Sequence, residues 1–198
     1  HTMGNHDNDP YVNADWQAET SFRSTLGPTY YSFNIGKVHY IVLDNIQYVN
    51  TGASQGSIGE RNYNGTIVAD QMTWLKKDLA TITDKSTPIV VSMHIQLNNM
   101  PSINETSSLR LTNSTEFITA LNGFTDVNVL TGHTHIAYAY ENSTSLMEHN
   151  SGAICATWWW TGRSGYANNQ ICKDGTPGGY AIWKFNDRNY DWRYKSIG

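Results

Sequence analysis

Two histidines separated by one residue give the clearest chemical signal in this sequence. They lie in the segment Gly132-His133-Thr134-His135, directly after an apolar run that ends at Leu130. Alternation along an extended segment would place both imidazoles on the same side, and neutral imidazole is a common ligand for zinc, manganese, iron and nickel. The pattern therefore indicates metal binding. The alternative is a pair of hydrogen-bonded surface histidines in a turn.

Two further groups complete a candidate site. Asn5, His6 and Asp7 follow a glycine near the start of the chain, and His94 ends the apolar run 89–93. An amide at a strand end can supply an oxygen ligand, and a histidine next to a carboxylate makes an acid–base group with an orienting partner. A single histidine such as His94 is otherwise more typical of a packed or capped residue.

The helices and strands that precede these residues would bring them together in the fold. Apolar residues at helical spacing predict a helix over Val68–Thr83, and a shorter helix is expected over Ser114–Asn122. Each helix precedes a buried strand, Ile89–Met93 and Asp126–Leu130 respectively. Helices that alternate with strands favour right-handed crossovers onto one sheet, and ligands bind at the carboxyl ends of such strands.

The first part of the chain predicts a short helix and a hairpin. The helix begins at Asn13 or Asp15 and ends near Thr25, and its inner face is expected to hold Trp16, Phe22 and Leu26. Strands are expected over residues 29–34 and 37–43. Residues 44–65 contain no clear element, and a loop of that length in a compact domain is usually functional or mobile.

No helical pattern follows Ile136, and the remaining chain predicts successive antiparallel strands over residues 136–141, 145–149, 153–158, 179–185 and 190–194. The expected fold class is therefore α/β (α+β). It consists of two packed mixed β-sheets flanked by helices, an αββα sandwich, with a C-terminal antiparallel β-meander. The expected domain organisation is a single domain over residues 1–198.

Composition excludes some classes of partner. Charged residues make up 15% of the 198 residues and the net charge is −4, which gives no basic surface for nucleic acid. No apolar stretch has the length of a membrane span. Cys155 and Cys172 are compatible with one disulfide or with two free thiols.

In their order, the three motifs resemble the calcineurin-like metallophosphoesterase family, which has Gly-Asn-His-Asp/Glu, then a lone histidine after a strand, then Gly-His-x-His. The resemblance implies two divalent metal ions, whether manganese, iron, zinc or nickel. It implies that Asn5, His94 and His133 bind one metal ion and His135 the other. It also implies that His6 is the general acid or stabilises the phosphoryl group, and that Asp7 orients His6.

The family's Asp-x-His and Gly-Asp motifs are absent from these residues. In the family they supply one metal ion with an aspartate and a histidine, and bridge the two ions with a second aspartate. We therefore expect the sequence to be an N-terminally truncated fragment with first strands missing, in which at most one metal site is partly formed. Such a fragment is expected to bind metal weakly and to hydrolyse little.

The C-terminal part has a narrower resemblance. Trp158 to Gly162, followed by the stretch from Cys172 to Tyr180, is similar to exported family members from Bacteroidetes, which implies a periplasmic or cell-surface location. Trp159 is a candidate platform for substrate and Arg163 a candidate phosphate contact. Core packing is the alternative for the tryptophans, because three adjacent side chains cannot all point into one core.

The resulting expectation is metal-dependent hydrolysis of phosphomonoesters or phosphodiesters, with a small-molecule or glycan phosphoester as substrate. One alternative is a non-catalytic module that binds a glycan or a partner and retains a relic metal site. A further alternative is a single-metal or metal-free hydrolase that uses His6. The sequence shows no serine or cysteine nucleophile in a recognisable setting.

Overall fold

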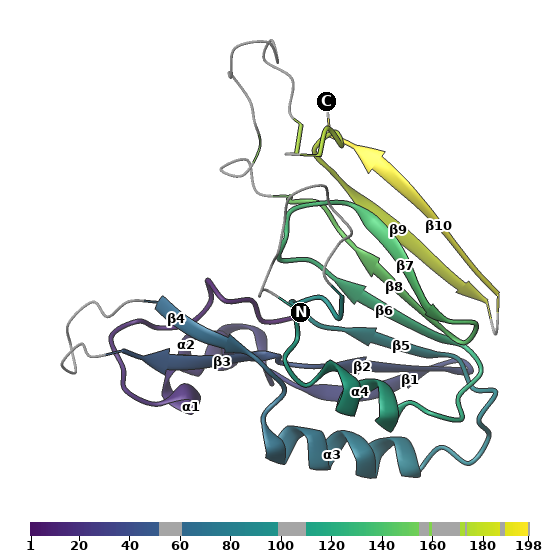
Figure 1. Ribbon diagram of the computed structural model, residues 1–198, viewed down its shortest axis with the longest axis horizontal. Helices are drawn as coiled ribbons and strands as arrows, with labels where there is room; N and C mark the ends of the chain where they lie inside the picture. Colours follow the sequence, from purple (N-terminus) through teal and green to yellow (C-terminus); the bar gives the residue numbers. More distant parts are fainter. Residues whose placement is uncertain are drawn as a thin grey trace.

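The computed structural model describes residues 1–51, 61–98, 110–154, 159, 171–172, 174–186 and 189–197 (Figure 1). Its elements are, in chain order, α1 Asp15–Ala18, α2 Thr20–Leu26, β1 Tyr31–Ile35, β2 Val38–Val42, β3 Ile46–Asn50, β4 Arg61–Gly65, α3 Ala69–Ala80, β5 Ile89–Ser92, α4 Ser114–Ala120, β6 Val127–Thr131, β7 Tyr138–Ser143, β8 Leu146–Asn150, β9 Gly179–Asn186 and β10 Asn189–Ser196.

A six-stranded mixed sheet forms the centre of the fold, in the order β1-β2-β5-β6-β8-β7. The four inner strands β2, β5, β6 and β8 run parallel, whereas β1 and β7 pair antiparallel at the two edges. The predicted α/β class and the alternation of helices with parallel strands are confirmed. Strand β8 pairs parallel with β6, so β7 and β8 extend the main sheet instead of belonging to a separate meander.

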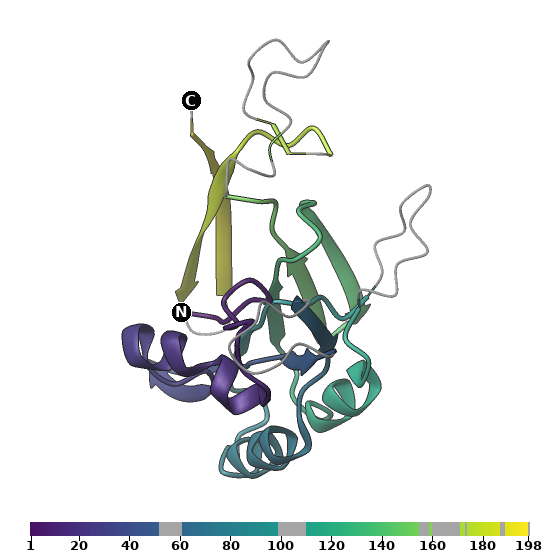
Figure 2. The same cartoon turned by 90° about the vertical axis from the view of Figure 1, so that its left-hand side faces the viewer.

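Helices α3 and α4 cover one face of this sheet (Figures 1 and 2). The sheet contributes Ile41, Val91 and Val129 to the core on this side, and the helices contribute Leu75 and Phe117. Because side chains alternate along a strand, every second residue of each strand points to this face and packs against the apolar stripes of the helices. This packing fixes the positions of the strand ends that carry the candidate site.

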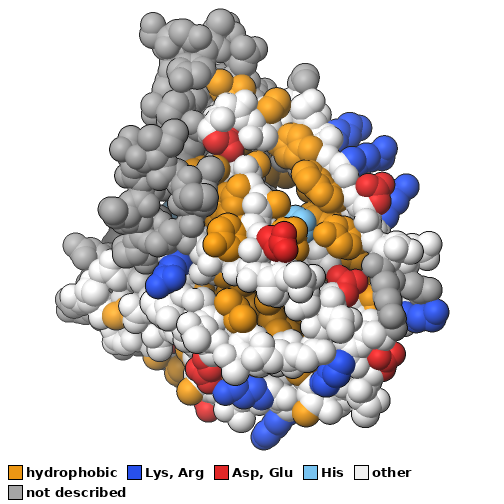
Figure 3. Space-filling model, turned by 45° about the vertical axis from the view of Figure 1, so that its right-hand side comes forward, with side chains coloured by type: hydrophobic (Ala, Val, Ile, Leu, Met, Phe, Trp, Pro, Cys, Tyr) orange, Lys and Arg blue, Asp and Glu red, His pale blue; other side chains and the backbone are white. Residues whose placement is uncertain are grey.

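The antiparallel hairpin β9–β10 lies over the opposite face of the sheet (Figure 2). Trp183 packs on His149 of β8 with ring centroids 4.5 Å apart, and Phe185 packs on Tyr40 of β2 at 5.9 Å. Beside this contact a cavity of about 600 Å³ lies between β7–β8 and the hairpin, and Figure 3 shows hydrophobic side chains gathered around a hollow on this side. The predicted C-terminal strand pair is thus confirmed as part of a second layer.

Two predictions about the first part of the chain were wrong. Residues 44–65 were expected to lack an element, but β3 and β4 form an antiparallel hairpin in which Tyr48 lies opposite Tyr63. Of the side chains expected on the inner side of the first helix, only Phe22 is buried, at 6% exposure, whereas Trp16 is 65% and Leu26 43% exposed. The chain breaks into α1 and α2 at Glu19, which changes the face that each residue presents.

Three smaller expectations have partial outcomes. No helix within the described part of the chain has the length and apolar character needed to cross a membrane. Cys172 is buried and carries a free thiol among the described residues, while Cys155 lies outside them. The strand expected over residues 153–158 also falls mostly outside the described residues.

Candidate metal centre

The carboxyl ends of β5 and β6 bring two of the predicted ligands together. Beyond the strands themselves, the main chain continues to pair: the Met93 amide donates to the Leu130 carbonyl at 3.1 Å, and the Gly132 amide donates to the His94 carbonyl at 2.9 Å. His94 and His133 therefore leave neighbouring parallel strands at the same level. The predicted meeting of strand ends at one edge of the sheet is confirmed for this pair.

The first residues of the chain run past this edge. The Thr2 hydroxyl lies 2.7 Å from the Ser92 hydroxyl at the end of β5, and Met3 is fully buried. The next residues form a turn, closed by a hydrogen bond from the Asp7 amide to the Gly4 carbonyl and one from the Gly4 amide to the Asp7 carboxylate. This turn presents Asn5 to His94.

Three ligand atoms converge at this point. The Asn5 Oδ1 lies 2.9 Å from the His94 Nε2, and the His133 Nδ1 lies 3.0 Å from the same nitrogen. The two imidazole rings meet edge to face, with centroids 4.9 Å apart. Three side chains from three distant segments thus direct an oxygen and two nitrogens to one place.

Both imidazoles are kept neutral. Burial, together with the nearby imidazoles of His133, His135 and His6, lowers the pKa of His94 to about 3. Burial also lowers the pKa of His133 to about 4, with smaller contributions from His135 and His6. A neutral imidazole retains the lone pair that a metal ion requires, so these histidines are in the protonation state of a ligand at neutral pH.

The donor set fits a divalent transition metal. Metal–nitrogen bonds of about 2.0–2.1 Å place two ligands of one ion about 3 Å apart, and the separations found here have that size. Among the described residues no group of three or more His, Cys, Asp or Glu side chains is arranged to hold a metal ion. The site therefore depends on the Asn5 amide in addition to His94 and His133.

The histidine pair does not adopt the extended conformation that alternation required. His133 has a φ of 69° and His135 a φ of 60°, so both residues lie in the left-handed region. Few non-glycine residues occupy this region, and each costs on the order of 1–3 kcal/mol unless the surroundings enforce it. Strain of this kind clusters at functional sites. Here a tight bend in the backbone sets the orientation of the two imidazole rings, and the alternation of side chains along a strand does not.

The other predicted residues lie around this centre. His6 is exposed, and both it and His135 lie close enough to His94 and His133 to affect their pKa values. The Asp7 carboxylate accepts the Gly4 amide and so stabilises the turn. The orientation of His6 by Asp7, and the assignment of His135 to a second metal ion, stay predictions.

Of the two candidate substrate contacts, one is placed by the structure. Trp159 donates its indole N–H to the Ala153 carbonyl at 2.7 Å, and its ring lies so close to Gly178 that a Cβ there would be 2.5 Å from it. These are packing contacts within the C-terminal part, and a role of Trp159 in substrate contact stays a prediction. Arg163 lies outside the described residues.

Sequence reasoning missed two residues that support the ligands. The Tyr63 hydroxyl on β4 lies 3.1 Å from the His133 Nε2. Asn45, which is fully buried, accepts the main-chain amides of His94 and Ile95 and donates to the Ile95 carbonyl. Both belong to the stretch without a predicted element. The β-favouring residues around Tyr48 and Tyr63 were the signal for the hairpin that places them.

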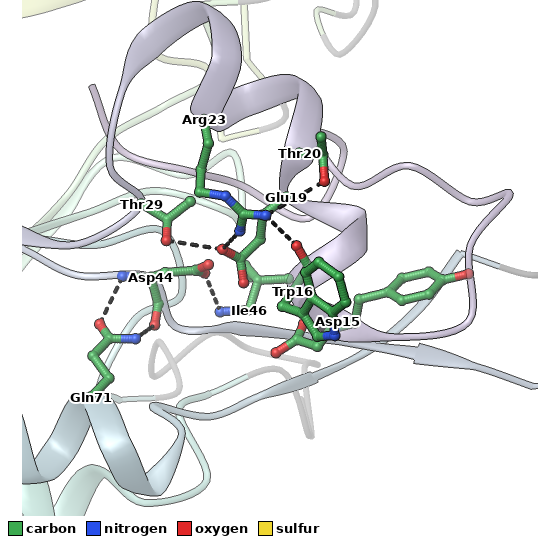
Figure 4. Close-up of polar contacts among 10 residues, drawn as sticks. Asp15, Trp16, Glu19, Thr20, Arg23, Thr29, Asp44, Ile46 and Gln71 are labelled. Atoms are coloured by element: carbon green, nitrogen blue, oxygen red, sulfur yellow. Dashed lines mark hydrogen bonds and ion pairs between the residues drawn. The ribbon is translucent and has the colours of Figure 1, made fainter.

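The main chain next to Asn45 is fixed by helix α3. The Gln71 side chain accepts the Asp44 amide at 3.0 Å and donates to the Asp44 carbonyl at 2.7 Å, and the Asp44 carboxylate accepts the Ile46 amide (Figure 4). Burial raises the pKa of the Asp44 carboxyl well above its usual value. This network holds the backbone from which Asn45 reaches the His94 segment.

The chain is an α/β protein whose candidate ligands converge at one edge of the sheet, and comparisons with known proteins show what it resembles. Residues 148–198 match the family described as the C terminal of calcineurin-like phosphoesterase. The fold matches the crystal structure of a dimetal phosphatase from Danio rerio with a TM-score of 0.54 and 14% identity, over 77% of this chain and 60% of that one. No curated protein matches the chain. The family match covers the C-terminal part of the chain, and the structural match shows the fold.

Proposed function

We propose that this chain carries part of the active site of a metal-dependent phosphoesterase that hydrolyses phosphomonoesters or phosphodiesters. The observation that carries this proposal is the convergence of the Asn5 Oδ1, the His94 Nε2 and the His133 Nδ1 at one strand edge. The family match of residues 148–198 and the shared fold support the reaction class, and the neutral imidazoles support metal binding. None of these observations favours a non-catalytic binding module.

Each residue has a distinct task in this proposal. Asn5, His94 and His133 hold a divalent metal ion, which when bound supplies a Lewis acid for the phosphoryl oxygen and lowers the pKa of bound water. His6 is exposed beside these ligands, where its imidazolium can give a proton to the leaving oxygen. The Asp7 carboxylate holds the turn that carries both Asn5 and His6.

The rest of the active site is also part of the proposal. His135 binds a second metal ion in this proposal. The chain spans 60% of the length of the matched phosphatase. An exported protein acting on a small-molecule or glycan phosphoester fits the narrower C-terminal resemblance. Trp159 and Arg163 are candidates for substrate contact in such a protein.

The test is hydrolysis of p-nitrophenyl phosphate and bis(p-nitrophenyl) phosphate with Mn²⁺ or Zn²⁺. It compares this chain with a longer form of the protein that carries Asp-x-His and Gly-Asp motifs, each beside its His133→Ala variant. We expect turnover in the longer form, little in the chain alone, and loss of turnover in the variant. A longer form that carries these motifs but neither binds metal nor turns over either ester would refute the proposal.

A further inference from the structure

Tyr63 reaches the candidate metal centre from an element that contributes no ligand. It lies on β4, opposite Tyr48 of β3, and its ring packs edge to face on His133 with centroids 5.8 Å apart. The same ring packs against the buried core cluster between the sheet and the helices. The hydroxyl is therefore held at the His133 Nε2, 3.1 Å away, by a side chain that cannot swing freely.

The strand that carries Tyr63 is itself fixed beside His94. Gly65 lies two residues further along β4, where a Cβ would come within 2.8 Å of the Ile95 side chain. The Gly65 carbonyl accepts the Thr112 amide, and the Thr66 amide donates to the Asn45 carbonyl. The distance from Tyr63 to the site is thus set by main-chain bonds and close packing on the residue after His94.

The polar contacts define a single arrangement of protons. In the metal-free chain the Asn5 Oδ1 is an acceptor, so the His94 Nε2 beside it carries the proton of that pair, and a metal ion bound at this nitrogen would have to displace that proton. That proton also faces the His133 Nδ1, which is then an acceptor with a free lone pair. A neutral imidazole has one ring proton, and His133 therefore carries its own on Nε2, where it faces the Tyr63 hydroxyl.

We propose that Tyr63 is a positioning residue for the metal centre: its hydroxyl accepts the His133 Nε2–H and keeps the Nδ1 lone pair aimed at the point shared with His94 and Asn5. Ligating histidines need such a partner on the second nitrogen, because it fixes both the tautomer and the ring orientation. This inference rests on the proposed function, in which His133 is a ligand.

The variant that tests the proposal is Tyr63→Phe, which removes the hydroxyl and retains the packed ring. The matched control is Tyr48→Phe, which removes a hydroxyl from the opposite strand of the same hairpin. The Tyr48 hydroxyl donates to the carbonyls of Pro10 and Val12. Each variant removes one phenolic hydroxyl, but only Tyr63→Phe removes the partner of His133.

Two measurements separate this inference from the proposed function. Proton–nitrogen correlation NMR of the metal-free chain, labelled at the histidine ring nitrogens, reports which nitrogen of His133 carries the proton. Calorimetric titration with Zn²⁺ reports metal affinity. We expect a protonated Nε2 in the unsubstituted chain and in Tyr48→Phe. In Tyr63→Phe we expect a mixture of tautomers and about tenfold weaker zinc binding.

An unchanged His133 tautomer in Tyr63→Phe, or an unsubstituted chain that carries the proton on Nδ1, would overturn the positioning role. Equal zinc affinity in Tyr63→Phe and in the unsubstituted chain would also overturn it. Failure of the unsubstituted chain to bind zinc at all would contradict the metal centre and hence the premise of the inference. The tautomer measurement would still decide whether Tyr63 sets the protonation of His133.

Discussion

The Oδ1 of Asn5 lies 2.9 Å from the Nε2 of His94, although 89 positions separate the two residues in the sequence. The contact exists because the first residues of the chain are anchored at the end of β5, where the Thr2 hydroxyl meets the Ser92 hydroxyl. The candidate metal centre is therefore assembled by tertiary packing. Its affinity for metal should respond to substitutions that shift this segment as well as to loss of a ligand.

Asn5→Ala removes a ligand atom without removing a large buried side chain. We expect zinc affinity to fall at least tenfold, and the free energy of unfolding of the metal-free chain to change by less than about 1 kcal/mol. Calorimetric titration with Zn²⁺ and urea unfolding measure the two quantities. Asn64→Ala is the control, because Asn64 is exposed and bonds to Gln47. Zinc affinity equal to that of the control would count against Asn5 as a ligand.

Gly4→Ala tests the close approach of the first segment to the His94 ring. A Cβ at this position would lie 3.1 Å from the His94 Nδ1 and 3.2 Å from its Cε1, so the ring or the segment has to move by a few tenths of an ångström. Zinc titration should show weaker binding, because a ligand displaced by this amount loses its geometry. Gly132→Ala is the matched control, since a Cβ there meets nothing within 4 Å. Equal affinities in the two variants would contradict the close-packing argument.

Asn45→Ala removes the side chain that holds the backbone of His94 and Ile95. Its loss leaves two amides and one carbonyl without their partner, so urea unfolding should show a stability loss of about 3 kcal/mol. Asn113→Ala is the matched control, because Asn113 holds the Ile67 amide and carbonyl in the same way. Both variants should be destabilised, but only Asn45→Ala should also lose zinc affinity. Loss of affinity in both would show that general destabilisation is the cause.

His149 makes stability depend on pH away from the metal centre. Its Nε2 lies 3.1 Å from the Asn128 Oδ1 and its ring packs on Trp183, and burial lowers its pKa from 6.5 to about 4. The unfolded state therefore binds this proton first as the pH falls below about 6.5, so folding stability decreases between pH 6.5 and pH 4.

From pH 7.5 to pH 5 this one group should lower the free energy of unfolding by about 2 kcal/mol. Urea unfolding at both values, for the unsubstituted chain and for His149→Gln, isolates its contribution from those of the buried carboxyls, which titrate in both proteins. The variant should be less sensitive to acid by that amount. An identical pH dependence in the two proteins would show that folding does not lower the pKa of His149.

The sequence predicted the strand ends but not the supports behind them. Apolar runs that end in His94 and before Gly132 locate parallel strands whose carboxyl ends must meet, because helical crossovers separate them. The conformation of His133 and His135 was not predictable, since the left-handed region is disfavoured locally and is enforced by surrounding contacts. Tyr63 was missed because β4 lies at the end of a long polar stretch that has no apolar run of its own.

Packing also determines which side chains near the start of the chain are buried and which are exposed to solvent. Trp16 was expected to be buried on a continuous helix, but the break at Glu19 turns its side chain to solvent. Strand β8 could not be assigned to the main sheet from sequence. Its alternation is compatible with either an antiparallel meander or a parallel position beside β6, and only the tertiary fold distinguishes them.

The most direct test of the metal centre is X-ray diffraction at the zinc absorption edge, from crystals of the chain grown with saturating Zn²⁺. Our account predicts an anomalous peak within about 2.0–2.3 Å of the Asn5 Oδ1, the His94 Nε2 and the His133 Nδ1. A zinc ion bound only by other residues, or no peak between these three atoms at saturating zinc, would contradict it.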